Sequence, residues 1–297
     1  MLEQLWDCPW SPSFRIARFL LALSLFSTLV GTATSDLFTP LADNIRGPDW
    51  SLFRLAGLDA GRGIALAVLL LVMSGRLPGI SSLFHFWVAA SFASSAVLLD
   101  GGDHVIVSLS LLMIPVATTD LLKDRSGRLG ALGRLFACYG RMAMMLQVVI
   151  IYLHAAISKL SEPHWIDGTA IYYWFTHPLI GPSSGVLGSL LSPLIETSIV
   201  CIITWGSILL EFALAASPLL PRRQRVVMFF FGVGFHAGII VIFGLNSFGL
   251  SMFAALLLLC EPLDPIGKLT VRVRDTVRWR GRRPLEPDQL SLLLERH

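Results

Sequence analysis

Three side chains capable of proton transfer or hydrogen bonding lie at the end of one apolar segment. Tyr152, His154 and Lys159 occupy its last turns, and Trp165 and Gly168 follow directly. An ionisable side chain in or near lipid is costly, so it marks a functional-site hypothesis. Residues seven apart lie almost above one another on a helix, which places Tyr152 and Lys159 on one face.

Lys159 has two possible roles. A lysine in an apolar pocket gives up its proton more readily, because burial disfavours the ammonium form, and the neutral amine can act as a general base. Ala155 and Ala156, between Tyr152 and Lys159, are small enough for a helix or a flat ligand to approach closely. The alternative is that Lys159 only extends into the lipid headgroups.

Two further ionisable side chains lie deep inside other apolar segments. Glu211 is within residues 194–219, and His236 is flanked by glycines within residues 226–259. An unpaired carboxylate is not expected there, so we predict a Glu211–Lys159 or a Glu211–His236 pair. The alternative is a protonated Glu211 bonded to a backbone carbonyl. The spacing of His and Glu within the segments is not that of a metal site, and none is predicted.

The composition identifies the class of protein that holds these groups. Of 297 residues, 54% are hydrophobic and 14% are charged, and the mean hydropathy is +0.70. Soluble domains carry roughly 25% charged residues, so this chain lacks the polar atoms to cover a water-facing surface. We predict an all-α, polytopic transmembrane helical bundle.

About eight membrane spans are predicted. The final apolar stretch, residues 226–259, would extend roughly 51 Å as one helix, against a core of about 30 Å. It is therefore divided at the turn residues 244–247. The predicted spans are residues 14–34, 60–73, 80–99, 104–119, 139–160 and 194–219, and two within 226–259.

The positions of Lys and Arg indicate the orientation. With eight crossings the main basic clusters all fall on one side: those at residues 15–18, 76, 123–141 and 222–225, and the tail after Lys268. Basic residues accumulate at the cytoplasmic ends of membrane spans, so both termini are predicted to lie on the cytoplasmic side of the plasma membrane. Arg46 and Arg54 are exceptions. We expect one transmembrane domain over residues 1–262 and a basic cytoplasmic tail over residues 263–297.

The segment 161–193 is predicted to lie outside. It is rich in aromatic residues, among them Trp165, Tyr172, Tyr173 and Trp174, and in Gly and Pro. Trp and Tyr favour the membrane interface, so we expect an interfacial element at the outer end of the bundle. The alternative is an aromatic belt that serves only as an anchor.

The remaining features are less specific. The apolar run after Arg18 could be a signal peptide, but the charge pattern favours a first span. The four cysteines show no CxxC spacing, and no disulfide is predicted. The basic tail could bind anionic lipid. Nucleic acid is not predicted as a partner, because membrane orientation already accounts for the charge.

Two motifs carry a family resemblance. The sequence YLHAAISKL at residues 152–160, with Trp165 and then DGTAIYYW at 167–174, resembles the hallmark of the HTTM (horizontally transferred transmembrane) family. The sequence FHAG at residues 235–238, with Gly244 and Phe248 after it, resembles a second sequence element of the same family. That family includes the membrane domain of vitamin K-dependent γ-carboxylase and the bacterial SdpB-like proteins. The chain length and the DGTAIYYW sequence are most similar to the SdpB-like branch.

The resemblance implies a function. SdpB-like proteins are associated with maturation of a secreted antimicrobial peptide toxin, together with a small SdpA-like partner protein. In the carboxylase, the lysine of the matching motif is regarded as the base that deprotonates a reduced quinone. Only Lys159 carries that role here, and a quinol is the implied cofactor. The chain lacks the large extramembrane region of the carboxylase, so glutamate carboxylation is not expected.

The expected site therefore combines one base with supporting residues. Tyr152 and His154 would bind or orient groups near Lys159. Trp165 and Gly168 would shape the outer mouth of the site. Glu211 and His236 would form a buried polar support.

Two other classes of function remain open: a non-catalytic scaffold or immunity protein for a peptide-toxin system, and a small-molecule transporter. The transporter would require inverted repeats, and the sequence shows no internal repeat.

Overall fold

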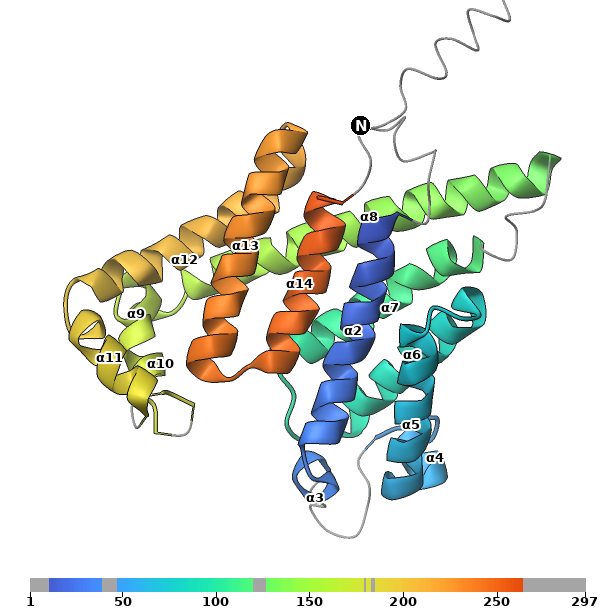
Figure 1. Ribbon diagram of the computed structural model, residues 1–297, viewed down its shortest axis with the longest axis horizontal. Helices are drawn as coiled ribbons and strands as arrows, with labels where there is room; N and C mark the ends of the chain where they lie inside the picture. The colour runs from blue at the N-terminus through green and yellow to red at the C-terminus, as the bar shows by residue number, and fades with distance from the viewer. Residues whose placement is uncertain (1–10, 39–46, 120–126, 179, 183–184, 264–297) are drawn as a thin grey trace, which may run out of the picture. The chain divides into compact units, whose positions relative to one another are not determined.

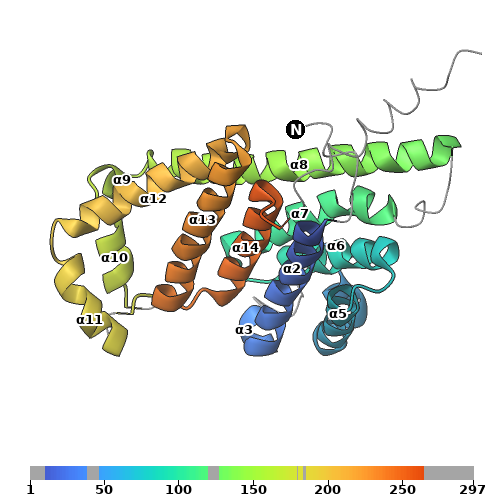
Figure 2. The same cartoon turned by 45° about the horizontal axis from the view of Figure 1, so that its top comes forward.

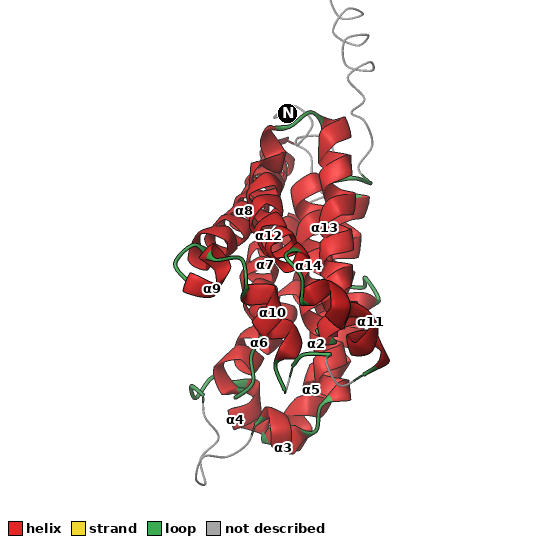
Figure 3. Cartoon of the chain, turned by 90° about the vertical axis from the view of Figure 1, so that its left-hand side faces the viewer, coloured by secondary structure: helices red, strands yellow, loops and turns green. Residues whose placement is uncertain are grey.

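The computed structural model describes residues 11–38, 47–119, 127–178, 180–182 and 185–263, and all regular structure within these ranges is helical (Figure 3). This confirms the all-α prediction. The helices, in chain order, are α2 (Pro12–Gly31), α3 (Thr34–Leu37), α4 (Leu52–Ala56), α5 (Leu58–Met73), α6 (Pro78–Ser95), α7 (Gly101–Thr118), α8 (Gly127–Lys159), α9 (Pro163–Ile166), α10 (Ala170–Thr176), α11 (Val186–Ile195), α12 (Ile199–Ala216), the 3₁₀ turn η2 (Ser217–Leu219), α13 (Arg222–Phe243) and α14 (Asn246–Cys260).

Five of the described helices are long and apolar enough to cross a membrane. They include α2, α7, α13, the part of α8 from Leu135 to Lys159, and α12 with η2. The protein is therefore an integral membrane protein with a helical bundle. The helices α5, α6 and α14 match the other predicted spans in position but lie outside this set. The count of eight and the cytoplasmic location of both termini stay predictions, and the tail from residue 264 lies outside the described residues.

The break in the last apolar stretch is where the sequence predicts it. Helix α13 ends at Phe243, and Gly244 adopts φ 71° in the left-handed region. Glycine reaches this conformation without a steric penalty, which is why it commonly ends helices. Helix α14 begins at Asn246, so α13 and α14 form an antiparallel pair in contact along their length.

Two helices begin at residues that differ from the starts of the predicted spans. Helix α8 begins at Gly127 rather than at residue 139, because arginine is a good helix former and a charged sequence can continue a helix. The predicted span 194–219 begins later, at Ile199. Thr197 interrupts the helix: its hydroxyl donates to the Leu194 carbonyl and accepts from the Ile199 amide, a local pattern that competes with helical bonding.

Helix α14 forms the centre of the bundle and contacts α2, α7, α8 and α13. Its residues from Ala254 to Cys260 are all buried. The long helix α8 crosses α2, α13 and α14 at a steep angle (Figures 1 and 2). At its C-terminal end, the predicted outer segment folds into α9, α10 and α11, which gather beside the start of α12 (Figure 1).

Candidate functional site

One face of α8 brings the sequence-predicted residues against α12. Val148, Tyr152 and Ala156 are buried at intervals of four residues, and Lys159 follows on the same face. This spacing is that of a packed helical stripe. Helix α12 runs beside this part of α8 and presents Thr204, Ser207 and Glu211 from its buried face.

Lys159 and Glu211 form an ion pair between these two helices. The Lys159 Nζ lies 2.8 Å from each carboxylate oxygen of Glu211, and it also donates to the Ala155 carbonyl at 3.3 Å. The side chains are 19% and 7% exposed, respectively. An ammonium has three donors, so Lys159 uses all of them within the bundle. Of the two pairs considered for Glu211, the structure contains the one with Lys159.

His236 is paired with Tyr152. The Tyr152 hydroxyl lies 3.0 Å from His236 Nε2, and both side chains are buried. The imidazole ring packs against the rings of Phe235 and Phe248, with centroids 5.0 Å and 5.6 Å away. Its Nδ1 atom is buried and has no hydrogen-bond partner among the described residues.

The two pairs form one polar site at two depths. Tyr152 precedes Lys159 by seven residues, which is about 10 Å along the helix. Lys159 is close enough to His236, and Glu211 to Tyr152, for electrostatic interaction. We call these four residues the outer polar site, after the predicted orientation of α8. The sequence predicts all four residues, but not the Tyr152–His236 contact.

Trp165 lies beside Lys159, and Gly168 lies against α12. The Trp165 ring centroid lies 5.1 Å from Lys159 Nζ, a distance at which the ring face attracts a cation. Gly168 is buried at φ 84°, and a Cβ there would lie 3.0 Å from Cys201 on α12. Only glycine allows this close approach, so the turn after α9 is held against α12.

The turn itself is fixed by Asp167. Its carboxylate accepts from the Thr169 amide at 2.9 Å and from the Thr169 hydroxyl. These hydrogen bonds favour the ionised form and hold the pKa of Asp167 below its usual value. The negative charge is therefore present throughout the neutral range, although it lies at the exposed surface rather than next to Lys159.

The expected role of His154 near Lys159 has no support in the described contacts. His154 lies on the exposed face of α8, because five residues place it about 140° around the helix from Lys159. No described hydrogen bond or ion pair joins His154 to the outer polar site. The ring belongs to the surface that α8 presents to its surroundings.

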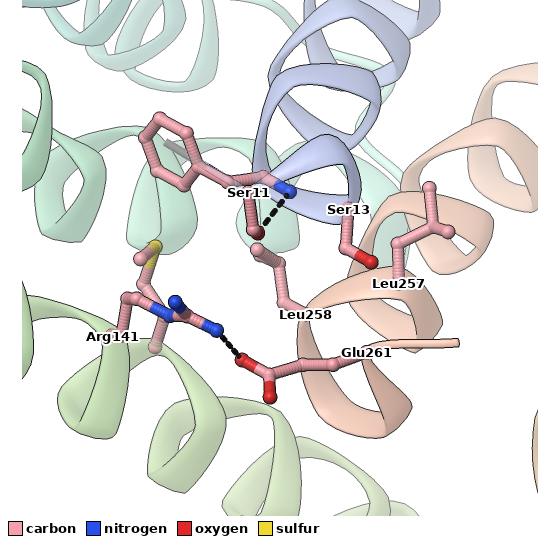
Figure 4. A pocket seen from close by; sticks show the side chains of 8 residues that line it. Ser11, Ser13, Arg141, Leu257, Leu258 and Glu261 are labelled. Carbon is pink, nitrogen blue, oxygen red and sulfur yellow. Dashed lines mark hydrogen bonds and ion pairs between the residues drawn. The ribbon is translucent and has the colours of Figure 1, made fainter. Parts of the chain in front are cut away.

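A small pocket lies far from the outer polar site. Figure 4 shows Arg141 of α8 bonded to Glu261 at the end of α14, beside Ser11 and Ser13. Arg141 precedes Lys159 by 18 residues, or about 27 Å of helix. The pocket therefore lies beside the middle of α8, and the sequence does not predict this ion pair.

Comparison with known proteins assigns the family. The model of the HTTM domain matches residues 110–263 of this chain. The chain belongs to the HTTM family. All four residues of the outer polar site lie within the matched HTTM domain, as do Trp165 and Gly168. No solved structure matches the chain.

Two curated relatives come from Bacillus subtilis (strain 168). The uncharacterized protein YitO is 30% identical over 276 residues, which cover 87% of this chain and 89% of the relative. The sporulation-delaying protein SdpB is 30% identical over 273 residues, covering 86% and 83%. The similarity therefore extends beyond the HTTM domain to the N-terminal helices, and the SdpB-like assignment is confirmed.

Proposed function

We propose that this protein takes part in the maturation or modification of a secreted peptide of the antimicrobial toxin type, with Lys159 as a proton-transfer group. The observation that carries the proposal is the Lys159–Glu211 pair, in which a largely buried carboxylate holds an ammonium that keeps 19% of its side chain exposed. The similarity to SdpB supports the peptide-toxin context. The proposed location is the plasma membrane, with multiple spans.

The pair can exist in two forms of equal net charge. In one, Lys159 is an ammonium and Glu211 a carboxylate; in the other, the proton lies on Glu211 and Lys159 is a neutral amine. Low-dielectric surroundings reduce the advantage of the charged form. In the neutral form, the Lys159 amine can accept a proton from a bound substrate. The product is an ammonium beside a protonated Glu211, with the negative charge on the substrate.

The residues around Lys159 fit a ring that carries a hydroxyl group. Trp165 provides an aromatic surface next to the amine, and the unpartnered Nδ1 of His236 provides a buried polar atom deeper in the bundle. A reduced quinone, when bound, supplies an acidic hydroxyl and reducing equivalents. Lys159 would take the hydroxyl proton, Glu211 would balance the charge, and Trp165 would limit the access of water.

The test compares the peptides that are secreted by three kinds of cells: cells with the wild-type gene, cells in which the gene is deleted, and cells with one of three variants. Mass spectrometry of the culture medium identifies a mature peptide that depends on the protein. We expect Lys159→Ala and Lys159→Arg to abolish this peptide, because arginine keeps the charge but does not release its proton. We expect Glu211→Gln to reduce it strongly. Immunoblots of membranes provide the abundance of each variant, and Arg62→Gln is the control for loss of a charge elsewhere.

A second candidate function is a non-catalytic scaffold for a peptide precursor and a small SdpA-like partner. It is favoured by the exposed aromatic face of α10, where Tyr172, Tyr173 and Trp174 are 38%, 50% and 45% exposed. Normal peptide levels in Lys159→Ala, combined with loss in Tyr173→Ala/Trp174→Ala, would favour the scaffold. The reverse pattern supports proton transfer.

A further inference from the structure

The start of the bundle contains a buried arginine without a counter-charge. Arg18 lies in the second turn of α2 and is 4% exposed. Its Nη2 donates to Ser81 Oγ of α6 at 2.5 Å, but its Nε has no partner. Among the residues that the structure describes, no carboxylate lies within ion-pair distance of Arg18.

Two polar groups near Ser81 in the sequence of α6 are also unsatisfied. Ser82 Oγ and His85 Nε2 are buried without a hydrogen-bond partner in the described part of the chain. His85 follows Ser81 by four residues and Ser82 by three, so it lies between these two side chains on the helix surface. Arg18 is close enough to His85 for electrostatic interaction. Three buried polar atoms without a described partner therefore lie on α2 and on the first two turns of α6.

The surrounding backbone adds to the positive potential. Ser81 lies in the first turn of α6, which begins at Pro78, and Arg18 lies in the second turn of α2, which begins at Pro12. The N-terminus of a helix carries a partial positive charge and favours anions. Arg15 and Arg76 are exposed at the same end. Burying an uncompensated charge costs several kcal/mol, so this arrangement is stable only if a negative group offsets it.

We propose that Arg18, Ser82 and His85 form a binding site for a phosphate-type oxyanion between α2 and α6, and we call it the inner anion site. Phosphate oxygens accept hydrogen bonds from guanidinium, hydroxyl and imidazole N–H groups. Arginine side chains on a helix lean towards its N-terminus. The guanidinium is therefore directed to the membrane surface, where a lipid phosphate or a free phosphate can reach it.

The experiment uses the full chain, purified and placed in nanodiscs of phosphatidylcholine. The Tm is measured as phosphatidylglycerol replaces part of the lipid and, separately, as inorganic phosphate is added. We expect one of the two to raise the Tm of the wild type, and the one that does identifies the source of the phosphate. Arg18→Met, which removes the charge but keeps the length, should lose this response and should not be less stable than the wild type in pure phosphatidylcholine.

Two further variants keep the test decisive. Arg62→Gln removes an arginine that bonds Thr34 elsewhere and should respond as the wild type does. Ser82→Ala keeps Arg18 and removes one donor, so the lipid or phosphate needed for half of the Tm rise should increase severalfold. An unchanged wild-type Tm under both additions would overturn the proposal. So would a full response in both Arg18→Met and Ser82→Ala.

Discussion

The outer polar site and the inner anion site each hold a basic side chain within the bundle, and they differ in how its charge is balanced. At the outer site, the ammonium of Lys159 is held by the carboxylate of Glu211 on a neighbouring helix. At the inner site, Arg18 is as deeply buried as Glu211 but has only a serine hydroxyl as its described partner. One charge is offset by a carboxylate, and the other has no carboxylate partner among the described residues.

This difference separates what each site can do. A pair that carries its own counter-charge can stay folded while its proton moves, which suits chemistry on a substrate. An arginine without a counter-charge is stable only when an anion is bound, which suits recognition of a ligand. In a membrane without anionic lipid, loss of the basic residue should therefore destabilise the protein at the outer polar site but not at the inner anion site.

The largest expected effect is loss of the Lys159 partner. Lys159→Met leaves the buried carboxylate of Glu211 without its counter-charge, and we expect the protein to lose about 3 kcal/mol of stability. Arg18→Met in the same phosphatidylcholine nanodiscs should show no loss. Thermal unfolding of both variants measures the contrast directly.

The double variant Lys159→Met/Glu211→Met sharpens this result. Removing both charges leaves no uncompensated group, so stability should return most of the way to that of the wild type. A double variant no more stable than Lys159→Met would contradict the description of the outer polar site as a mutually compensating pair.

The next effect concerns the turn at Gly168, which lies against α12. Gly168→Ala forces a side chain into a left-handed conformation and against Cys201 at 3.0 Å, which should cost about 2 kcal/mol. Gly206→Ala is the matched control on α12, because its Cβ would meet nothing within 4 Å. The control should be neutral or gain up to about 1 kcal/mol. Equal Tm values for the two variants would remove the claim that Gly168 holds the turn in place.

A smaller effect is expected at the deeper pair. Tyr152→Phe leaves both nitrogens of His236 without a described partner, at a cost of about 1–2 kcal/mol. Tyr173→Phe also removes a tyrosine hydroxyl, but Tyr173 is half exposed, so this variant should change stability very little. The comparison of their Tm values isolates the buried hydrogen bond, and a Tyr152→Phe protein as stable as Tyr173→Phe would show that this bond contributes nothing.

The smallest effect is expected at Asp167. Its pKa is lowered by hydrogen bonds from Thr169, so the folded state binds this proton less tightly than the unfolded state. The resulting stabilisation is present at neutral pH and is lost as the pH falls through the lowered pKa, below the ordinary value of 3.8. Asp167→Asn should therefore lower the Tm slightly at pH 7 and not at acidic pH. A difference that grows towards acidic pH would reverse this sign.

The sequence predicts the helices better than it predicts their contacts. Composition alone indicates a helical membrane protein, and Gly244 marks the turn between α13 and α14. The start of α8 was not predicted because a charged sequence can continue a helix beyond its apolar part. The break at Thr197 was not predicted because it depends on local hydrogen bonds in a sequence that is compatible with helix.

For the outer polar site, too, the sequence predicts the residues better than their contacts. The spacing of Tyr152 and Lys159 places them on one face of the helix. The free-energy cost of an unpaired carboxylate in a membrane indicates that Glu211 has a partner. Which partner it has depends on how α12 and α13 pack against α8, and sequence periodicity does not contain that information. Arg18 is the clearest case: its sequence position indicates only a basic residue at a span end, whereas the structure buries it against α6.

The most direct test of the outer polar site is peptide maturation by Lys159→Arg compared with Arg62→Gln in the same cells. Both variants change a basic residue whose side chain is hydrogen-bonded, and both are measured at equal membrane abundance. The proton-transfer account predicts that Lys159→Arg releases no mature peptide while Arg62→Gln still does. Mature peptide at wild-type levels from Lys159→Arg would contradict it.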